Sequence, residues 1–164
     1  MESSLEIENP YLPRLMKVQK IRVETDNIKT FEFKETFSHL PGQFVELSVF
    51  GAGEVPISIS SAPPNLDLTV NRVGIVTNAI YDLEVGDVVG IRGPYGNGFT
   101  LTRGNVMMVG GGTGLAPLMP LTEKLMKNAI KLTFLLGAKT KNELLFLDSI
   151  NQTISKDNME IVAT

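Results

Sequence analysis

The sequence contains no cysteine. This absence excludes disulfides, a cysteine-ligated iron–sulfur cluster and a cysteine-based zinc site in this chain. It has a single histidine, His39. One histidine supplies little for a metal site or for a Ser-His-Asp triad. Because His39 stands just before P-G-Q-F, we interpret it as a loop residue.

The chain also lacks a surplus of positive charge and any long apolar run. Its formal net charge is −3 and its pI is about 5.2, with scattered lysines and arginines. Nucleic acid is therefore not an expected partner. No apolar run approaches membrane-spanning length, and residues 1–8 are acidic where a signal peptide is basic. We expect a soluble, cytoplasmic protein without a membrane partner.

Two common catalytic motifs are missing as well. There is no G-x-S-x-G, so serine hydrolase chemistry has no support. The P-loop pattern is absent, because the glycines near residue 112 lead into Ala116 and Pro117 instead of a lysine.

Short β-type runs separated by glycine and proline corners fill the first part of the chain. In one of them Phe31 and Phe33 alternate with Glu32 and Lys34. Many short strands with such corners predict an antiparallel barrel. A short helix is expected after Gly74. The predicted strands lie within residues 15–25, 30–34, 41–50, 55–61, 66–74 and 86–94.

The pattern changes at Asn105. Residues 105–110 form a continuous apolar run, which predicts a strand buried on both faces. The following segment has Leu118, Leu121 and Leu125 at helical spacing. Strand, helix, strand, helix and strand then follow in turn, which predicts a parallel βαβαβ unit. We therefore expect two domains, residues 1–102 and 103–164.

The stretch V-G-G-G-T-G-L-A-P, residues 109–117, joins the first parallel strand to its helix. Bare backbone admits a diphosphate, and a helix N-terminus offers free amides and a positive dipole end. Pro117 suits an early helical position. The spacing is not G-x-G-x-x-G, because Leu115 stands where the last glycine belongs. A tight strand-to-helix turn without a ligand is the alternative.

Five motifs occur in one order: V-P-I-S-I-S-S-A-P, N-R-V-G-I-V-T-N-A-I, R-G-P-Y-G-N-G-F, V-G-G-G-T-G-L-A-P and L-L-G-A-K-T-K-N-E-L-L-F. Together they resemble the ferredoxin–NADP reductase superfamily. The similarity is closest to electron-transfer subunits of multi-subunit hydrogenases, anaerobic sulfite reductase and dihydroorotate dehydrogenase. The resemblance implies an FAD-binding antiparallel barrel followed by a nicotinamide-nucleotide domain.

The resemblance also implies two sets of flavin contacts. In the first, this sequence keeps the family's serine but lacks its arginine and its aromatic residue, and an ordinary buried strand is the alternative. In the second, Arg72 can pair with phosphate, and a solvated arginine beside a turn is the alternative. The implied FAD-binding residues are Pro56, Ile57, Ser58, Ile59, Asn71, Arg72, Val73, Gly74 and Thr77.

For NAD(P)H the resemblance implies the glycine turn and the loop after the second parallel strand. Lys139 in that loop is a candidate for the ribose or its 2′-phosphate, and an ordinary surface lysine is the equal alternative. No acid, base or metal ligand is assigned. The implied nucleotide-binding residues are Gly111, Gly112, Thr113, Gly114, Ala116, Pro117 and Lys139.

The implied function is electron transfer from NAD(P)H through FAD to an iron–sulfur protein or to hydrogenase or reductase subunits, with no iron–sulfur cluster in this chain. A non-catalytic flavin-binding or docking module and a generic flavin reductase are the alternatives. Family members continue with further strands and a cysteine cluster beyond the point where this sequence stops. We therefore expect either a truncated chain or a short form completed by another chain.

Overall fold

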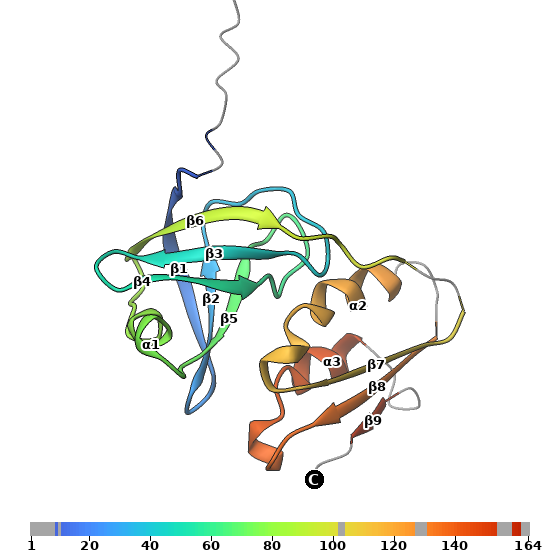
Figure 1. Ribbon diagram of the computed structural model, residues 1–164. Coiled ribbons are helices and arrows are strands. Elements are labelled where there is room, and N and C mark those ends of the chain that lie inside the picture. Colours follow the sequence, from blue (N-terminus) through green and yellow to red (C-terminus); the bar gives the residue numbers. More distant parts are fainter. Residues whose placement is uncertain (1–8, 10, 102–103, 127–130, 154–158, 162–164) are drawn as a thin grey trace, which may run out of the picture.

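The structure is a computed structural model that describes residues 9, 11–101, 104–126, 131–153 and 159–161. It contains a six-stranded antiparallel sheet and a three-stranded parallel sheet, which occupy separate parts of the molecule (Figure 1). The predicted combination of an antiparallel β unit with a parallel α/β unit is confirmed. The predicted division between residues 102 and 103 falls outside the described ranges and stays a prediction.

The six-stranded sheet has the strand order β4-β3-β6-β1-β2-β5. Phe31 and Phe33 are buried on its inner face, as their alternation predicts. Each of the six strands falls on or beside a predicted run. Their bounds are β1 Arg14–Thr25, β2 Ile28–Phe33, β3 Phe44–Val49, β4 Gly53–Ser58, β5 Asp67–Asn71 and β6 Val88–Tyr95.

The sheet curls until its two outer strands meet. Just beyond β4, Ile59 forms an isolated bridge with Leu68 of β5, and the Ser60 amide donates to the Asp67 carbonyl over 2.9 Å. The predicted helix is confirmed as α1, Ile75–Tyr81, which contacts β3, β4 and β5. Away from the junction the two strands are bridged by α1, which contacts both β4 and β5, and not by a ladder.

The orientation of β4 follows from its pairing with β3. Val55 and Ile57 lie opposite Leu47 and Val45, which are both fully buried. Val55 and Ile57 therefore face the core side, yet both are only partly buried. Pro56 points to the opposite face and is exposed.

The parallel sheet has the order β7-β8-β9, with helical segments between the strands, as predicted. Leu121 and Leu125 of its first helix are buried against it, as the helical spacing predicts. The elements are β7 Val106–Gly111, the 3-10 turn η1 Gly112–Leu115, α2 Leu118–Met126, β8 Leu132–Gly137, the 3-10 turn η2 Lys141–Glu143, α3 Leu147–Thr153 and β9 Met159–Ile161.

The prediction that β7 is buried on both faces is wrong. Met108 is 3% exposed, but Met107 and Val109 are 66% and 62% exposed. Two right-handed crossovers that advance in the same direction put both of their helices on one face of a sheet. Accordingly, α2 and α3 lie on the same side of the parallel sheet (Figure 1) and share a core cluster with Met108.

Gly111 supports a stability prediction. It pairs with Gly137 of β8, and a Cβ at residue 111 would lie 2.7 Å from the Gly137 carbonyl oxygen. Gly111→Ala should therefore lower the free energy of unfolding by about 1–3 kcal/mol, as overpacking does. A Cβ at Gly114 meets nothing within 4 Å, so Gly114→Ala is the matched control. Urea denaturation that gave equal stabilities for the two variants would contradict this assignment.

Candidate functional site

A cleft of about 840 Å³ lies between the β1–β2 hairpin and the loops that follow β7 and β8. Open α/β sheets bind ligands outside the carboxyl ends of their parallel strands, which is where these loops lie. The cleft is lined by residues 23–28, Asn71, Gly112, residues 138–140, Asn142 and Glu143.

The cleft brings together only three of the predicted site residues: Asn71, Gly112 and Lys139. These three residues come from both units of the fold. Asn71 ends β5, whereas Gly112 and Lys139 belong to the parallel unit. The remaining predicted nucleotide-binding residues flank Gly112 in the same turn. Of these, Ala116 is 1% exposed and its amide donates to the Thr113 carbonyl over 3.0 Å, so this residue is not open to a ligand.

The glycines of the turn differ in the reason for lacking a side chain. A Cβ at Gly110 would lie 2.7 Å from Leu115 Cδ2, so packing excludes it, as it does at Gly111. Gly112 has φ +53°, a left-handed conformation that favours glycine. Gly114 has neither a crowded Cβ position nor a positive φ. Its bare backbone is therefore not explained by the protein's own packing.

Gly74 at the start of α1 resembles Gly114 in this respect. Its φ is −155°, and a Cβ would meet only Thr77 Oγ1, at 4.0 Å. The neighbouring Val73 and Ile75 are 78% and 83% exposed. The turn is thus an open apolar surface around a bare backbone position.

Thr77 stabilises this turn from within. Its hydroxyl oxygen accepts hydrogen bonds from the amides of Val73 and Gly74, at 2.9 and 2.8 Å, and its proton is directed to the Gly74 carbonyl at 3.1 Å. The Thr77 hydroxyl proton, which the sequence predicts to be donated to a phosphate, is therefore donated within the turn in this structure.

The predicted phosphate-binding arginine has an unexpected neighbour. Arg72 is exposed, and its guanidinium carbon lies 4.9 Å from the centre of the Tyr81 ring. Lys29 Nζ lies 4.0 Å from the same ring and donates to the Tyr81 carbonyl over 2.7 Å. Sequence reasoning missed Lys29, because nothing in the sequence pairs it with a residue so far along the chain.

The first predicted flavin motif is split between two faces and the core. Ile57 faces the core side of the sheet, whereas Ser58 lies opposite Phe44 on the other face and is partly buried. Ile59 is fully buried. His39, predicted to be a loop residue, lies between β2 and β3 with its Nε2 2.9 Å from the Ser61 carbonyl.

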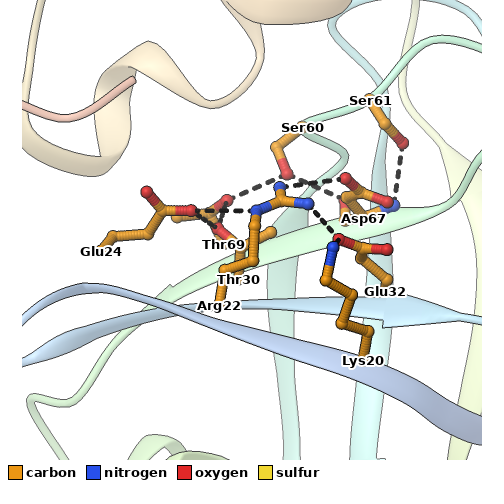
Figure 2. A network of polar contacts seen from close by, with 9 residues as sticks. All are labelled: Lys20, Arg22, Glu24, Thr30, Glu32, Ser60, Ser61, Asp67 and Thr69. Carbon is orange, nitrogen blue, oxygen red and sulfur yellow. Dashed lines mark hydrogen bonds and ion pairs between the residues drawn. The ribbon is translucent and has the colours of Figure 1, made fainter. Parts of the chain in front are cut away.

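A network of charged side chains adjoins the cleft, and sequence reasoning missed it. Figure 2 shows Arg22 among three carboxylates. Its Nη2 lies 3.2 Å from Asp67 Oδ2, its Nε lies 3.5 Å from Glu24 Oε1, and its Nη1 contacts Glu32. Lys20 approaches Glu32 at 3.5 Å. The alternation of Lys20, Arg22 and Glu24 along β1 was the available signal.

Hydroxyl groups connect this network to the junction of β4 with β5. Thr30 donates to Glu24 over 2.7 Å and lies 2.8 Å from the Thr69 hydroxyl. Thr69 donates to the Ser60 hydroxyl over 2.9 Å. Glu24 is also one of the residues that line the cleft, so it belongs to both features.

Burial has the largest effect on the pKa of Asp67. Desolvation raises the pKa of Asp67, and the nearby Arg22 offsets this only in part. For Arg22, burial alone would lower the pKa, but Asp67, Glu32 and Glu24 together outweigh it and raise the pKa.

Across the described ranges no group of three or more His, Cys, Asp or Glu residues is placed to hold a metal ion. The helices in these ranges are all too short or too polar to cross a bilayer.

No profile of a known protein family matches the chain. Among curated proteins, it is 40% identical over 136 residues to the probable dihydroorotate dehydrogenase B (NAD(+)) electron transfer subunit of Methanocaldococcus jannaschii, covering 83% of this chain and 52% of the relative. It is 34% identical to the sulfhydrogenase 1 subunit gamma of Pyrococcus furiosus, covering 94% of this chain and 60% of that subunit.

The chain is a homologue of these two subunits. The resemblance expected from the sequence motifs is thereby confirmed. The chain spans about half the length of the curated relatives it matches.

Solved structures show the same fold. The structure of an NADH-dependent reduced ferredoxin-NADP oxidoreductase matches with a TM-score of 0.78 and 26% identity. The match covers 92% of this chain and 56% of that structure's chain. The flavohaem-like FAD/NAD-binding domain of nitric oxide dioxygenase from Vibrio cholerae matches with a TM-score of 0.81 and 20% identity, covering 93% and 73%. The fold is that of ferredoxin–NADP reductase-like proteins.

The raised pKa of Asp67 predicts a pH dependence. The folded protein holds this proton more tightly than the unfolded chain does, so the associated stability is present below the unfolded pKa and is lost as the pH rises through the folded pKa. Asp67→Asn cannot undergo this loss. Its free energy of unfolding relative to the parent should therefore increase between about pH 3 and about pH 7.

Urea denaturation across this pH range measures the effect. Asp82→Asn, at an exposed position, controls for the substitution itself. A constant difference between Asp67→Asn and the parent at every pH would show that Asp67 is not the group responsible.

Proposed function

We propose that this chain binds FAD on its six-stranded unit and NAD(P)H on its parallel unit, as part of an electron-transfer subunit. Electrons would pass from NAD(P)H through FAD to an iron–sulfur protein or to the subunits of a hydrogenase or reductase. The names of its homologues support this proposal, since they are electron transfer subunits of dihydroorotate dehydrogenase and gamma subunits of sulfhydrogenases.

The observation that carries the proposal is the pair of open glycines, one in each unit. Gly74 and Gly114 both follow a strand and stand at or beside a helical start, and neither is required by packing or by φ. Bare backbone at such a turn lets a phosphate approach the free amides of the first helical turn. Two independent turns of this kind fit two dinucleotides.

Residues around Gly74 fit a flavin nucleotide. Val73 and Ile75 are exposed apolar side chains, and Ile57 is only partly buried on the core side of β4. These surfaces suit the flat rings of FAD. No described carboxylate forms an ion pair with the exposed Arg72, so its charge is available to the pyrophosphate, whereas Lys29 already donates to the Tyr81 carbonyl.

Residues of the parallel unit fit the nicotinamide nucleotide. The turn Gly112–Leu115 presents its amides at the carboxyl end of β7, and Lys139 is exposed in the neighbouring loop. Because the cleft is walled by both units, a dinucleotide in it lies against the barrel hairpin. This arrangement positions the nucleotide without a side-chain acid or base.

Bound flavin supplies the conversion between the two-electron hydride of NAD(P)H and the single electrons that an iron–sulfur centre accepts. The residues of this chain bind and orient the two nucleotides. The residues assigned to the two nucleotides lie on strands and short turns, which favours a defined separation between their rings.

Two glycine substitutions test the assignment separately. Gly74→Ala should weaken FAD binding about tenfold, equivalent to about 1.4 kcal/mol, because the methyl group occupies the phosphate approach. Gly114→Ala should weaken NAD(P)H binding by a similar factor and leave FAD content unchanged. FAD is measured by its absorbance and its release on denaturation, and NAD(P)H binding by equilibrium titration.

Several outcomes would contradict the proposal. Purified protein that is colourless and takes up no added FAD would refute flavin binding. Equal losses of FAD in Arg72→Ala and Lys139→Ala would refute the assigned pyrophosphate site, because only Arg72 belongs to the same β5–α1 turn as Gly74. Bound flavin that NAD(P)H does not reduce would favour the non-catalytic module.

A further inference from the structure

We propose that Tyr81 is a positioning residue for the cleft. Tyr81 is not one of the residues that line the cleft, but its side chain fixes the tip of the β1–β2 hairpin, and residues 23–28 of that hairpin form one wall. The affinity of the cleft for its ligand therefore depends on the last residue of α1, the helix that begins at the proposed flavin turn. This inference rests on the proposed binding of a nicotinamide dinucleotide in the cleft.

The hairpin itself constrains its tip only weakly. Asp26 and Asn27 form a two-residue turn, and the β1–β2 register shifts between Val23 and Thr25, just before that turn. Within the turn the Asn27 amide donates to the Thr25 hydroxyl over 3.4 Å, which is long for a hydrogen bond. Contacts from outside the hairpin therefore have a large effect on where its tip lies.

The tip is held from two sides. On one side Ile28 is 8% exposed and belongs to the core cluster of the parallel unit. On the other side the Tyr81 hydroxyl donates to the Asp26 carbonyl over 2.9 Å. The Arg72 amide donates to the neighbouring Asn27 carbonyl, also over 2.9 Å. The tip therefore lies between α1 and the parallel unit (Figure 1).

Two cations add further contacts to the same tyrosine. Lys29 Nζ lies 4.0 Å from the centre of the Tyr81 ring and donates to the Tyr81 carbonyl over 2.7 Å. This carbonyl belongs to the last residue of α1, and the C-terminal end of a helix favours a positive charge. The guanidinium carbon of Arg72 lies over the same ring at 4.9 Å. Tyr81 is thus the common partner of the hairpin turn, of β2 and of the segment that follows β5.

A fixed hairpin tip keeps the wall of the cleft in one position. If the tip moves among several positions, only the fraction of molecules with the wall in place binds the ligand, and the apparent affinity falls by that fraction. The net contribution of one hydrogen bond corresponds to about a fivefold change in such a population. Loss of the Tyr81 hydroxyl should therefore weaken binding in the cleft about fivefold, although no lining residue is changed.

Amide hydrogen exchange by NMR and equilibrium titration with NAD⁺ and NADP⁺ test the inference on the complete chain. Tyr81→Phe removes the hydroxyl and keeps the ring. It should accelerate exchange of the Arg72 amide, which bonds the same turn, and weaken binding of the nucleotide that the parent prefers, each about fivefold. Tyr81→Leu also removes the ring contacts of Lys29 and Arg72, so its effects should be larger. Tyr11→Phe, at a tyrosine that is 80% exposed, is the matched control and should change neither quantity.

The outcomes separate this inference from the proposed function. Unchanged exchange of the Arg72 amide in Tyr81→Phe would overturn the anchoring of the hairpin by the hydroxyl. Faster exchange with unchanged affinity for both nucleotides would overturn the effect on the cleft and leave the proposed nucleotide site standing. Equal acceleration at the Val89 amide, in the buried core of β6, would show a general loss of stability and overturn the specific role of Tyr81. Failure of the parent to bind either nucleotide would overturn the inference together with the proposed nucleotide site.

Discussion

The junction between β4 and β5 is the constraint on which the rest of this structure depends. A single bridge from Ile59 to Leu68, with the backbone bond from Ser60 to Asp67, closes the curled sheet. Because the closure is so short, α1 covers the rest of the gap and contacts β3, β4 and β5. The polar groups at the junction also contact Arg22 and its carboxylates, and one of these residues, Glu24, lines the cleft.

Much of the fold follows from local signals. The alternation along β2 predicted a strand, the glycine and proline corners predicted the breaks between strands, and the spacing of Leu121 and Leu125 predicted a helix. These patterns arise directly from backbone geometry and from burial of one face of each element. The parallel pairing of β7, β8 and β9 followed from the alternation of strands and helices along the chain. The rule for right-handed crossovers, applied twice, also puts both helices on one face, so the exposure of Met107 and Val109 was deducible but was not deduced.

Less of the candidate site could be predicted from the sequence. The glycine turn was found because its residues are contiguous, but which of its glycines lack a packing reason is visible only in three dimensions. Lys29 meets Tyr81 through the curl of the sheet, and Asp67 meets Arg22 across strands β1, β2 and β5. Such contacts depend on strand order and register, which local patterns do not encode.

Glu24 belongs both to the ion network of the six-stranded unit and to the wall of the cleft. Thermodynamic linkage makes that a reciprocal relation. Any ligand whose charge is felt by Glu24 must alter the stability of the six-stranded unit, and a perturbation of Arg22 or Asp67 must alter the ligand's affinity by the same coupling free energy. The two halves of the molecule therefore share an electrostatic free energy, and neither can be tuned independently of the other.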